Sequence, residues 1–503
     1  MKLKDLFVFK NENMKVLHLT TIAFFITFVT WFNMAPLATV MMKTEGWLTK
    51  DKLAVFAIMN VAMTVPARVI IGSLLDRFGP RIVFSVLLVS MSLPTFAFAF
   101  GTDWMQMAIS RALLSCIGAG FVVGIRMVSE WFPPKNIGFA EGIYAGWGNF
   151  GAAFAAMTLP WLALSIFGGD NGWRYAIALT GLICLIYGVI YYFLVRDTPA
   201  GNVYFRPKRA AAIEVSSWKD MLQLILWTFP LVGVLGLLNW KLEKTSLITP
   251  AMTTGIYIIL LLVFIYQVIR ILQVNVPILK KGVPEDDRYS FRNVAALNTT
   301  YFANFGAELA VVSMLPAFFQ SEYMLQPTTA GLIASSFAFV NLFSRPLGGW
   351  VSDHFRSRKL VMLTYMTGIF IGFFLMGLIH SSMPLLLAVL ISIFTSFFVS
   401  GAEGATFAMI PIIKKRITGQ VAGMTGAYGN VGAVTYLTLL TLVNPHQFFF
   451  ILSLGALGSF IFCGIMLKEP KHAYGMDYHL SSVDRQLLQD QHKISFSEKE
   501  VTA

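Results

Sequence analysis

The stretch Gly72-Ser-Leu-Leu-Asp76-Arg77-Phe78-Gly79-Pro80-Arg81 follows a long apolar run, and a related stretch, Gly349-Trp-Val-Ser-Asp353-His-Phe-Arg356, follows another run far along the chain. The aspartates of the two stretches are 277 residues apart. A second pair of motifs, Gly146-Trp-Gly-Asn149-Phe-Gly-Ala and Ala427-Tyr-Gly-Asn430-Val-Gly-Ala, repeats at an offset of 281 residues. Two motifs that repeat at nearly the same offset predict a chain of two homologous halves.

Composition places both halves in a membrane. The 503-residue chain is 56% hydrophobic and only 13% charged, whereas ordinary soluble domains carry about 25% charged residues. Apolar runs of about 20 residues recur along it, which is long enough for a helix to cross roughly 30 Å of hydrocarbon. The runs do not alternate polar and apolar positions as the strands of a membrane barrel would. We therefore expect an all-α membrane protein.

The apolar runs divide the chain into four parts. We expect an N-terminal six-helix half at 1–196, a loop with two inserted helices at 197–293, a C-terminal six-helix half at 294–467 and a disordered tail at 468–503. The alternative to fourteen spanning helices is twelve, with the inserted pair lying at the membrane interface. The expected helices are at 17–42, 53–76, 82–101, 104–130, 137–166, 173–195, 219–240, 249–272, 294–319, 327–352, 359–380, 383–412, 418–443 and 446–467.

Charge predicts how the helices are oriented. The net charge is +12, and its basic residues gather in alternate short loops, as the positive-inside rule requires of cytoplasmic loops. This pattern argues against nucleic-acid binding and predicts a multi-pass protein of the inner (plasma) membrane with both termini in the cytoplasm. We also expect the protein to be a monomer. The loops in question carry Arg77 and Arg81, Lys135, Arg356 with Arg358 and Lys359, and Lys414 with Lys415 and Arg416.

The segment 72–81 resembles the G-x-x-x-D-R-x-G-R-R loop of the major facilitator superfamily, with Pro80 where a basic residue is usual. Arg111, Gly118 and Gly120 also resemble its R-x-x-x-x-x-x-G-x-G pattern. The resemblance covers all of the chain except the inserted pair and the tail. It implies two parallel six-helix halves, alternating access, and a cytoplasmic gate in which charged side chains pair when the inside is closed. The gate candidates are Asp76, Arg77, Glu130 and Asp353. The alternative is a loop that only anchors the topology.

Two arginines lie within apolar runs that are expected to span the membrane. Arg68 and Arg345 each precede a motif aspartate by eight residues, about 12 Å along a helix and so near mid-bilayer. An arginine at that depth costs about 2.5–3.5 kcal/mol on insertion scales. Their separation equals the offset of the halves, so they are expected to face each other across a central cavity, where they would repel without an anion between them.

The guanidinium is planar and presents its donors in a rigid fork, which suits a planar oxyanion such as nitrate or nitrite, or a carboxylate. The competing hypothesis pairs each arginine with a buried carboxylate, for which Glu308 and Glu403 are the candidates. The repeated Gly-Asn cores carry a further hint, because packing explains their glycines but not Asn149 and Asn430. An asparagine amide beside a ligand can donate to an oxyanion.

Both Gly-Asn motifs resemble the nitrate signatures of the nitrate/nitrite porter family. The resemblance implies that Arg68 and Arg345 hold the anion between the halves. It also implies aromatic rings beside the anion: Tyr301-Phe-Ala-Asn-Phe305-Gly is similar to the segment that opens the family's second half, and Phe121 is similar to the ring on the other side. The i, i+4 spacing puts Tyr301 and Phe305 on one helix face.

These observations favour a secondary active importer of nitrate or nitrite. Carrying an anion into a negative interior costs about 2.3 kcal/mol per 100 mV, so import needs cotransported cations or an exchanged anion. We expect proton symport, with Glu308 the better proton carrier and Glu403 the second. Nitrate/nitrite antiport and transport of another small anion such as a carboxylate are the alternatives. No catalytic cluster is visible, so we expect neither an enzyme nor a cofactor or bound metal.

Overall fold

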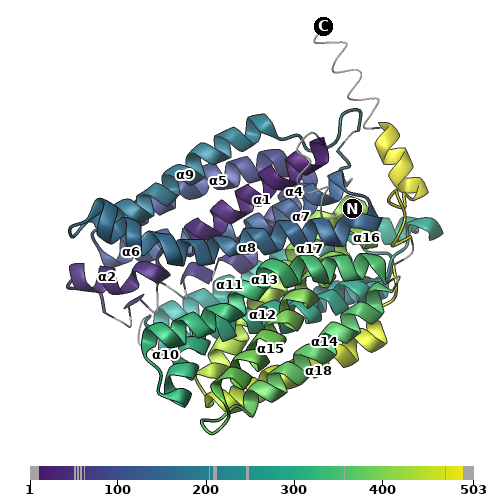
Figure 1. Cartoon of the computed structure of the whole chain (residues 1–503). Helices are drawn as coiled ribbons and strands as arrows, with labels where there is room; N and C mark the ends of the chain where they lie inside the picture. Colours follow the sequence, from purple (N-terminus) through teal and green to yellow (C-terminus); the bar gives the residue numbers. More distant parts are fainter. Residues whose placement is uncertain are drawn as a thin grey trace.

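The computed structural model describes residues 11–49, 52–53, 56, 59–61, 63–202, 204–207, 212–244, 248–355, 357–470 and 472–490. Within them the chain is helical, and the long helices run side by side in a single bundle (Figure 1). Arg356 of the basic loops, the first ten residues and the tail beyond residue 490 lie outside the described residues.

The first half contains α1 to α9. Its described helices are α1 (Glu12–Trp31), α2 (Ala38–Thr44), α4 (Thr64–Phe78), α5 (Pro80–Ala99), α6 (Trp104–Leu114), α7 (Gly120–Trp131), α8 (Ile137–Trp161) and α9 (Gly172–Leu194). The run expected at 17–42 is divided between α1 and α2, and the described α4 begins at Thr64, within the run expected at 53–76. The run expected at 104–130 is interrupted by a 3₁₀ turn at Ser115–Ala119. The turn lies beside Arg68, whose Nε donates to the Gly118 carbonyl.

The inserted pair and the second half complete the bundle. The pair is α10 (Trp218–Lys244) and α11 (Pro250–Lys281), the latter continuing past its predicted end at 272. The second half comprises α12 (Phe291–Tyr323), α13 (Pro327–His354), α14 (Arg358–Gly377), α15 (Leu385–Phe407), α16 (Ile410–Ile413), α17 (Thr418–Leu440) and α18 (Pro445–Met466). The halves meet where α4 packs on α17 and α13 packs on α8.

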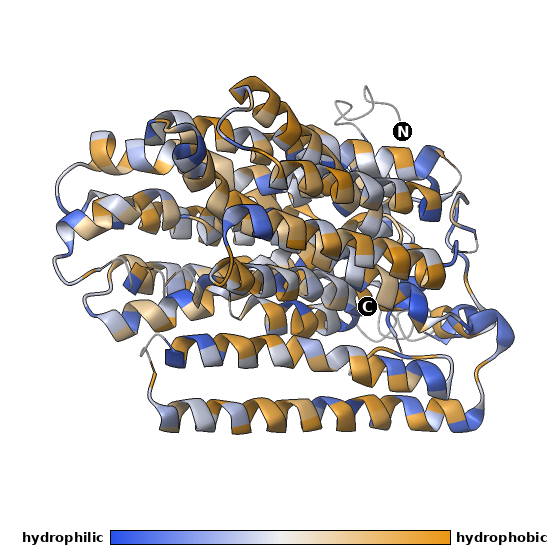
Figure 2. Cartoon of the chain, turned by 90° about the horizontal axis from the view of Figure 1, so that it is seen from below, coloured by the Kyte–Doolittle hydropathy of each residue, from blue (hydrophilic) through white to orange (hydrophobic). Residues whose placement is uncertain are grey.

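Within the described residues, twelve helices are long and apolar enough to cross a membrane, and both inserted helices are among them. α13 and α17 are not among the twelve, although they span 28 and 23 residues. Both carry motif residues, such as Arg345 and the glycines near Asn430, that lower their hydropathy while facing the protein interior. The expected count of fourteen is therefore not confirmed. Hydrophobic residues occupy most of each long helix, and hydrophilic residues are concentrated towards the helix ends (Figure 2).

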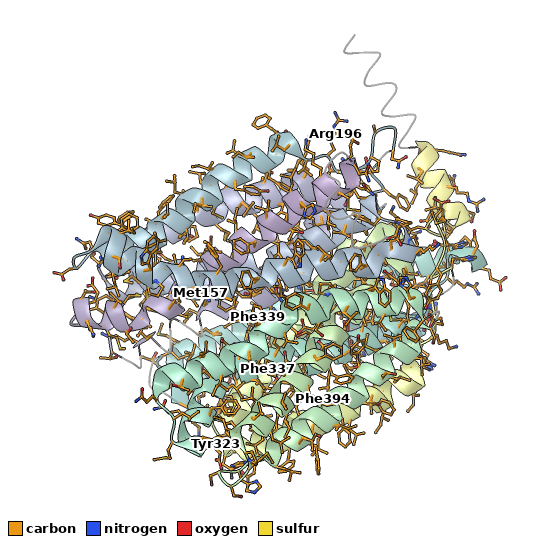
Figure 3. The ribbon with its side chains drawn as sticks, in the orientation of Figure 1. Met157, Arg196, Tyr323, Phe337, Phe339 and Phe394 are labelled. Atoms are coloured by element: carbon orange, nitrogen blue, oxygen red, sulfur yellow. The ribbon has the colours of Figure 1, made fainter. Side chains whose placement is uncertain are left out.

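Large apolar side chains point outward from the bundle. Met157 of α8 is 72% exposed and Phe339 of α13 is 52% exposed, while Phe337, two residues away, is buried (Figure 3). Burial of apolar side chains within the bundle, together with an apolar exterior, is what a lipid environment favours. Arg196 and Tyr323 lie at opposite ends of the bundle in the same view.

The loop motif forms a sharp turn between α4 and α5. Gly79 ends α4 at φ +87°, a conformation that L side chains rarely adopt, and Pro80 occupies the first position of α5. Proline is favoured at that position because its missing N–H has no helical partner anyway. The departure from the family pattern at Pro80 therefore fits the turn. Asp197 receives the next N–H, from Arg81, at 2.7 Å.

We call the end of the bundle that carries Asp76 and Asp353 the motif end. The start of α1 and a short helix at residues 482–490 also lie there (Figure 1). The tail was expected to be disordered from residue 468, but the described part folds back on the bundle. Tyr478 donates to the Phe132 carbonyl at 3.2 Å, and Ser481 donates to Asp287 at 2.7 Å. These contacts correct that expectation for the described residues.

Candidate functional site

The structure brings the two predicted arginines to one aromatic ring. Arg68 of α4 and Arg345 of α13 are each only 1% exposed. Their guanidinium carbons lie 5.5 and 5.2 Å from the centroid of the Phe121 ring on α7. The two charges therefore converge from opposite halves of the chain on the same buried point, as their sequence positions predict.

Arg68 is held by backbone carbonyls and not by an acid. Its Nε donates to the Gly118 carbonyl at 3.2 Å, and one terminal nitrogen donates to the Gly426 carbonyl at 2.5 Å. The first acceptor belongs to the 3₁₀ turn of the N-terminal half and the second to α17. No carboxylate lies within ion-pair distance of Arg68 among the described residues. A buried charge that lacks a counter-ion is costly, so this guanidinium is suited to receive an anion.

Arg345 differs, because it has an acidic neighbour. One of its terminal nitrogens lies 2.5 Å from Glu403 Oε2 on α15, and the other donates to the Tyr301 hydroxyl at 3.2 Å. The competing hypothesis of a buried ion pair thus holds for one arginine of the two. The site therefore contains one arginine in an ion pair and one, Arg68, that forms no ion pair with a carboxylate among the described residues.

The second predicted carboxylate lies beside the first. Glu308 of α12 accepts a hydrogen bond from the Asn341 amide at 2.7 Å, and its carboxyl group also interacts with that of Glu403. Glu308 Oε2 has no hydrogen-bond partner in the described structure, whereas Glu403 contacts Arg345 as an ion pair. Two neighbouring buried carboxyl groups repel when both are ionised, so this pair can share a proton.

Aromatic rings form the walls of the site. Tyr301 stacks on Phe305 with ring centroids 4.9 Å apart and planes 5° apart, and Tyr301 is also parallel to Phe121 at 6.1 Å. Phe407 of α15 packs edge-on against Phe121 at 4.6 Å and against Tyr301 at 4.7 Å. All three rings predicted from the sequence are therefore grouped around the arginines, together with Phe407, which was not predicted.

The Gly-Asn motif of α17 makes room for these rings. A methyl group added at Gly429 would lie 2.6 Å from the Tyr301 ring and 2.7 Å from the Phe305 ring, both too close for real contacts. Asn430 is fully buried, and neither atom of its amide has a hydrogen-bond partner in the described structure. An orphaned buried amide one turn from Gly426, which binds Arg68, fits a polar ligand between the halves.

The matching motif of α8 does not mirror this arrangement. Gly142 and Gly146 approach the backbone of α13 around Arg345, as the stripe of small residues predicts. Asn149, by contrast, is only half-buried, and no hydrogen bond joins it to the arginines or rings described above. The predicted symmetry of the two asparagines is thus present in the sequence but not in their burial.

The motif aspartates cap helices of the opposite half. Asp76 accepts the N–H groups of Gly419 and Gln420, both at 3.0 Å, at the start of α17. Asp353 accepts those of Gly138 and Phe139, at 3.0 and 2.9 Å, at the start of α8. A carboxylate at a helix N-terminus is favourable because it meets free N–H groups and the positive end of the helix dipole. These pseudo-symmetric contacts close the motif end.

The ion pairs at the gate differ from those expected from the sequence. Arg126 of α7 lies between two acids, 3.7 Å from Asp76 and 3.1 Å from Glu130. It also donates to the Lys415 carbonyl across the halves. Arg77 is exposed, and its guanidinium lies 5.0 Å above the ring of its neighbour Phe78. The expected ion pair of Arg77 is absent from the described contacts, because the side chain leaves α4 on the outer side.

The second half has its own arginine beside the gate. Arg358 donates to Asp353 at 2.9 Å and to the carbonyls of Pro134 and Ala473 at 2.8 and 3.2 Å. One side chain thereby joins the C-terminal half, the N-terminal half and the tail. Its position five residues after the aspartate was the only sequence signal for this role.

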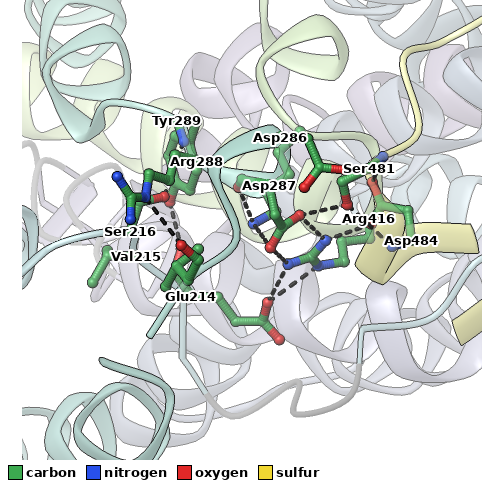
Figure 4. Close-up of polar contacts among 12 residues, drawn as sticks. Glu214, Val215, Ser216, Asp286, Asp287, Arg288, Tyr289, Arg416, Ser481 and Asp484 are labelled. Carbon is green, nitrogen blue, oxygen red and sulfur yellow. Dashed lines mark hydrogen bonds and ion pairs between the residues drawn. The ribbon is translucent and has the colours of Figure 1, made fainter. Parts of the chain in front are cut away.

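A further cluster at the motif end joins the inserted pair to the tail (Figure 4). Arg416 contacts Glu214 before α10 at 3.0 Å, Asp287 after α11 at 2.7 Å, and Asp484 of the tail helix. Burial disfavours the charged form, but the bonds to Asp287, Glu214 and Asp484 raise the pKa of Arg416 above its ordinary value. The basic loop predicted only for orientation therefore also fixes three segments together.

Several site residues could not be read from the sequence. Phe407 is one of many phenylalanines, and nothing marks it apart from its place four residues after Glu403. Asn341 is likewise marked in the sequence only by its place one helical turn before Arg345. Among the described residues, no group of three or more His, Cys, Asp or Glu side chains is arranged to hold a metal ion.

Comparisons with known proteins agree on the family. The model of the Major Facilitator Superfamily matches residues 20–282 and 297–478. A protein of Nostoc punctiforme named nitrate/nitrite transporter NrtP is 46% identical over 483 residues, covering 95% of this chain and 96% of the relative. A protein of the same name from Picosynechococcus sp. is 43% identical over 510 residues, covering 93% and 95%.

A solved structure supports the fold. The transporter FucP in an outward conformation superposes with a TM-score of 0.64 at 12% identity, covering 91% of this chain and all of that one. At this identity the likeness concerns the fold alone. The relatives by sequence are named as transporters, which confirms the prediction of a multi-pass membrane transporter and not an enzyme.

Proposed function

Because this chain belongs to the major facilitator superfamily and, within it, to the nitrate/nitrite porter family, we propose that it imports nitrate and nitrite by alternating access. The observation that carries the proposal is the convergence of Arg68 and Arg345 on Phe121, with Arg68 in no ion pair among the described residues. A monovalent planar anion between the two guanidinium groups would supply the missing charge and accept from both forks.

We place the protein in the inner membrane of the cell as a monomer, with the motif end and both termini in the cytoplasm. The basic residues of the motif end support this orientation. Fourteen spanning helices also belong to the proposal. In addition to the twelve apolar helices, α13 and α17 run through the bundle between the same two ends (Figure 1).

The described contacts correspond to a transporter whose cytoplasmic side is closed. The N–H groups of α17 and α8 bound by Asp76 and Asp353 must be released before the anion leaves inward. Methyl groups added at Gly72 or Gly349 would overlap the backbone of Gly419 or Gly138. The close crossings of the helices therefore depend on glycine, which lets them slide during the exchange.

We propose that protons drive import through Glu403 and Glu308. Glu403 is in direct contact with Arg345, so its protonation would free that guanidinium for the anion while leaving the pair of carboxyl groups less charged. The sequence favoured Glu308, but the contact with Arg345 makes Glu403 the better candidate, with Glu308 sharing its proton. One proton per anion cancels the charge moved, and two let the membrane potential drive uptake.

The test is uptake of labelled nitrate into proteoliposomes with and without an inward proton gradient. We expect accumulation above equilibrium only with the gradient, and loss of that dependence in Glu403→Gln. Glu322→Gln is the matched control, because Glu322 lies at the end of α12 opposite the motif end and contacts His446. Accumulation that requires internal nitrite instead of a gradient would establish antiport. Uptake of a small carboxylate in place of nitrate would refute the substrate.

A further inference from the structure

A cleft lies where the inserted pair meets both halves of the transporter. It has a volume of about 250 Å³ and is open to the outside of the bundle. Its walls come from α4 of the first half, α17 of the second half, α10 and α11, and the segment before α10. They are Val69, Ile70, Ser73, Leu74, Ala212, Ile213, Leu224, Thr228, Leu231, Tyr266, Gln267, Arg270, Ile271, Gln420 and Met424.

Two side chains of the cleft, Gln420 and Arg270, have hydrogen-bonding groups that the described protein leaves unused or only partly used. Gln420 is 4% exposed, and neither atom of its side-chain amide has a hydrogen-bond partner in the described structure. Arg270 donates only to Gln273 of its own helix, at 3.3 Å, among the described hydrogen bonds. No carboxylate forms an ion pair with Arg270 in the described part of the chain, and no acidic side chain lines the cleft.

The depth of Arg270 is fixed by its helix. Asn275, five residues further along α11, bonds the backbone of the loop before α10: it accepts from Val215 N–H at 2.8 Å and donates to the Ile213 carbonyl at 3.0 Å. Arg270 thus lies about 7 Å deeper than this loop. If the loop before α10 lies at the membrane surface, this is the level at which lipid phosphate groups meet the acyl region, and an arginine can reach them from within an apolar helix.

The remaining walls are mostly apolar, and their polar members are Ser73, Thr228 and Gln267. Ser73 and Thr228 donate to carbonyls of their own helices, those of Val69 and Leu224. Ile70 is 55% exposed and Tyr266 is 60% exposed, whereas Leu224 and Leu231 form the buried floor. A ligand that fits must therefore have an anionic head and an apolar tail lying along the outside of the bundle. A zwitterionic head would bring a cation for which the cleft has no acidic partner.

We propose that the cleft binds one anionic phospholipid of the motif-end leaflet, with its phosphate on Arg270 and an ester carbonyl on the Gln420 amide. The backbone N–H of Gln420 is one of the two that donate to Asp76, so the lipid also contacts the residue at which Asp76 joins the two halves. Because it touches α4 and α17 together, the bound lipid favours the closed motif end. This assigns a role to the inserted pair, which completes the site. It does not depend on which anion is transported.

The test is the melting temperature of the purified full-length protein in detergent, with no nitrate present. We add phosphatidylglycerol, phosphatidylcholine or inorganic phosphate, and count retained lipids by native mass spectrometry. We expect phosphatidylglycerol to raise the melting temperature by a few degrees and one molecule to remain bound. We expect Arg270→Gln to lower the affinity for phosphatidylglycerol about ten-fold. We expect Arg270→Lys to retain part of that affinity.

Lys281→Gln is the matched control, because it removes one charge from the same helix outside the cleft. It is expected to keep the full shift. Equal loss in Lys281→Gln, or an unchanged shift in Arg270→Gln, would overturn the proposal in favour of general attraction to the membrane surface. An equal shift with phosphatidylcholine would overturn the anionic specificity. An equal shift with inorganic phosphate would overturn the lipid assignment.

Discussion

Arg68→Lys tests the site most directly, because lysine keeps the charge but loses the fork. In the structure two different nitrogens of Arg68 bind the Gly118 and Gly426 carbonyls, at 3.2 and 2.5 Å. A single ammonium cannot hold both carbonyls and still present a planar pair of donors to an anion. Loss of one hydrogen bond to a charged group is worth about 1.5–3 kcal/mol, which corresponds to a roughly 10- to 150-fold loss of nitrate affinity.

The assay is nitrate-dependent stabilisation of the purified protein, followed by uptake into proteoliposomes. Arg174→Lys is the matched control. Arg174 also binds two carbonyls, those of Ala99 and Gly101 at 2.9 and 2.7 Å, but it lies outside the site, next to Glu45. We expect Arg174→Lys to keep nitrate affinity within about two-fold even if its stability falls. Wild-type affinity in Arg68→Lys, or an equal loss in the control, would refute the reasoning.

Three further predictions follow from the same geometry. Gly429→Ala displaces the Tyr301 ring and should weaken nitrate binding at least ten-fold by titration, while Gly458→Ala, which faces open space, should change nothing. Asp76→Asn should open the motif end, which would be measured as a longer distance between spin labels at residues 77 and 468. An unchanged distance would contradict the role of Asp76 in closing the motif end. Arg416→Ala leaves three acids together and should lower the free energy of unfolding by about 3–5 kcal/mol. The tail should then become sensitive to limited proteolysis, and a tail as resistant as in the wild type would contradict this prediction.

The core of the site was predictable because buried charge is rare in membrane helices. Arg68 and Arg345 could be picked out since each breaks an apolar run at the same distance from a repeated motif. The aromatic residues followed from the resemblance to a family and not from any pattern of their own. All of these side chains meet in the structure, although they come from α4, α7, α12 and α13.

The partners of those charges were not predictable, because they depend on tertiary contacts that leave no local pattern. The Gly426 carbonyl that binds Arg68 belongs to the other half of the chain, and any residue type has a carbonyl. The acids that surround Arg416 come from three separate segments. Arg77 shows the opposite error: its motif position predicted an ion pair, but the direction of its side chain decides against one.

The two aspartate caps bear on how the site and the gate are coupled. Each cap contributes two hydrogen bonds to a charged acceptor, at about 1.5–3 kcal/mol each, so the four together strongly favour the closed motif end. A transporter whose two states exchange must offset this preference within a few kcal/mol. We propose that Arg68 supplies this offset, because it lies on the same helix as Asp76 and binds α17, the helix that Asp76 caps. On the proposed function, an anion drawn between Arg68 and Arg345 would compete for the guanidinium that holds the Gly426 carbonyl. Anion binding would then weaken the contact of α4 with α17, and the Asp76 bonds to the start of α17 would be the next to break.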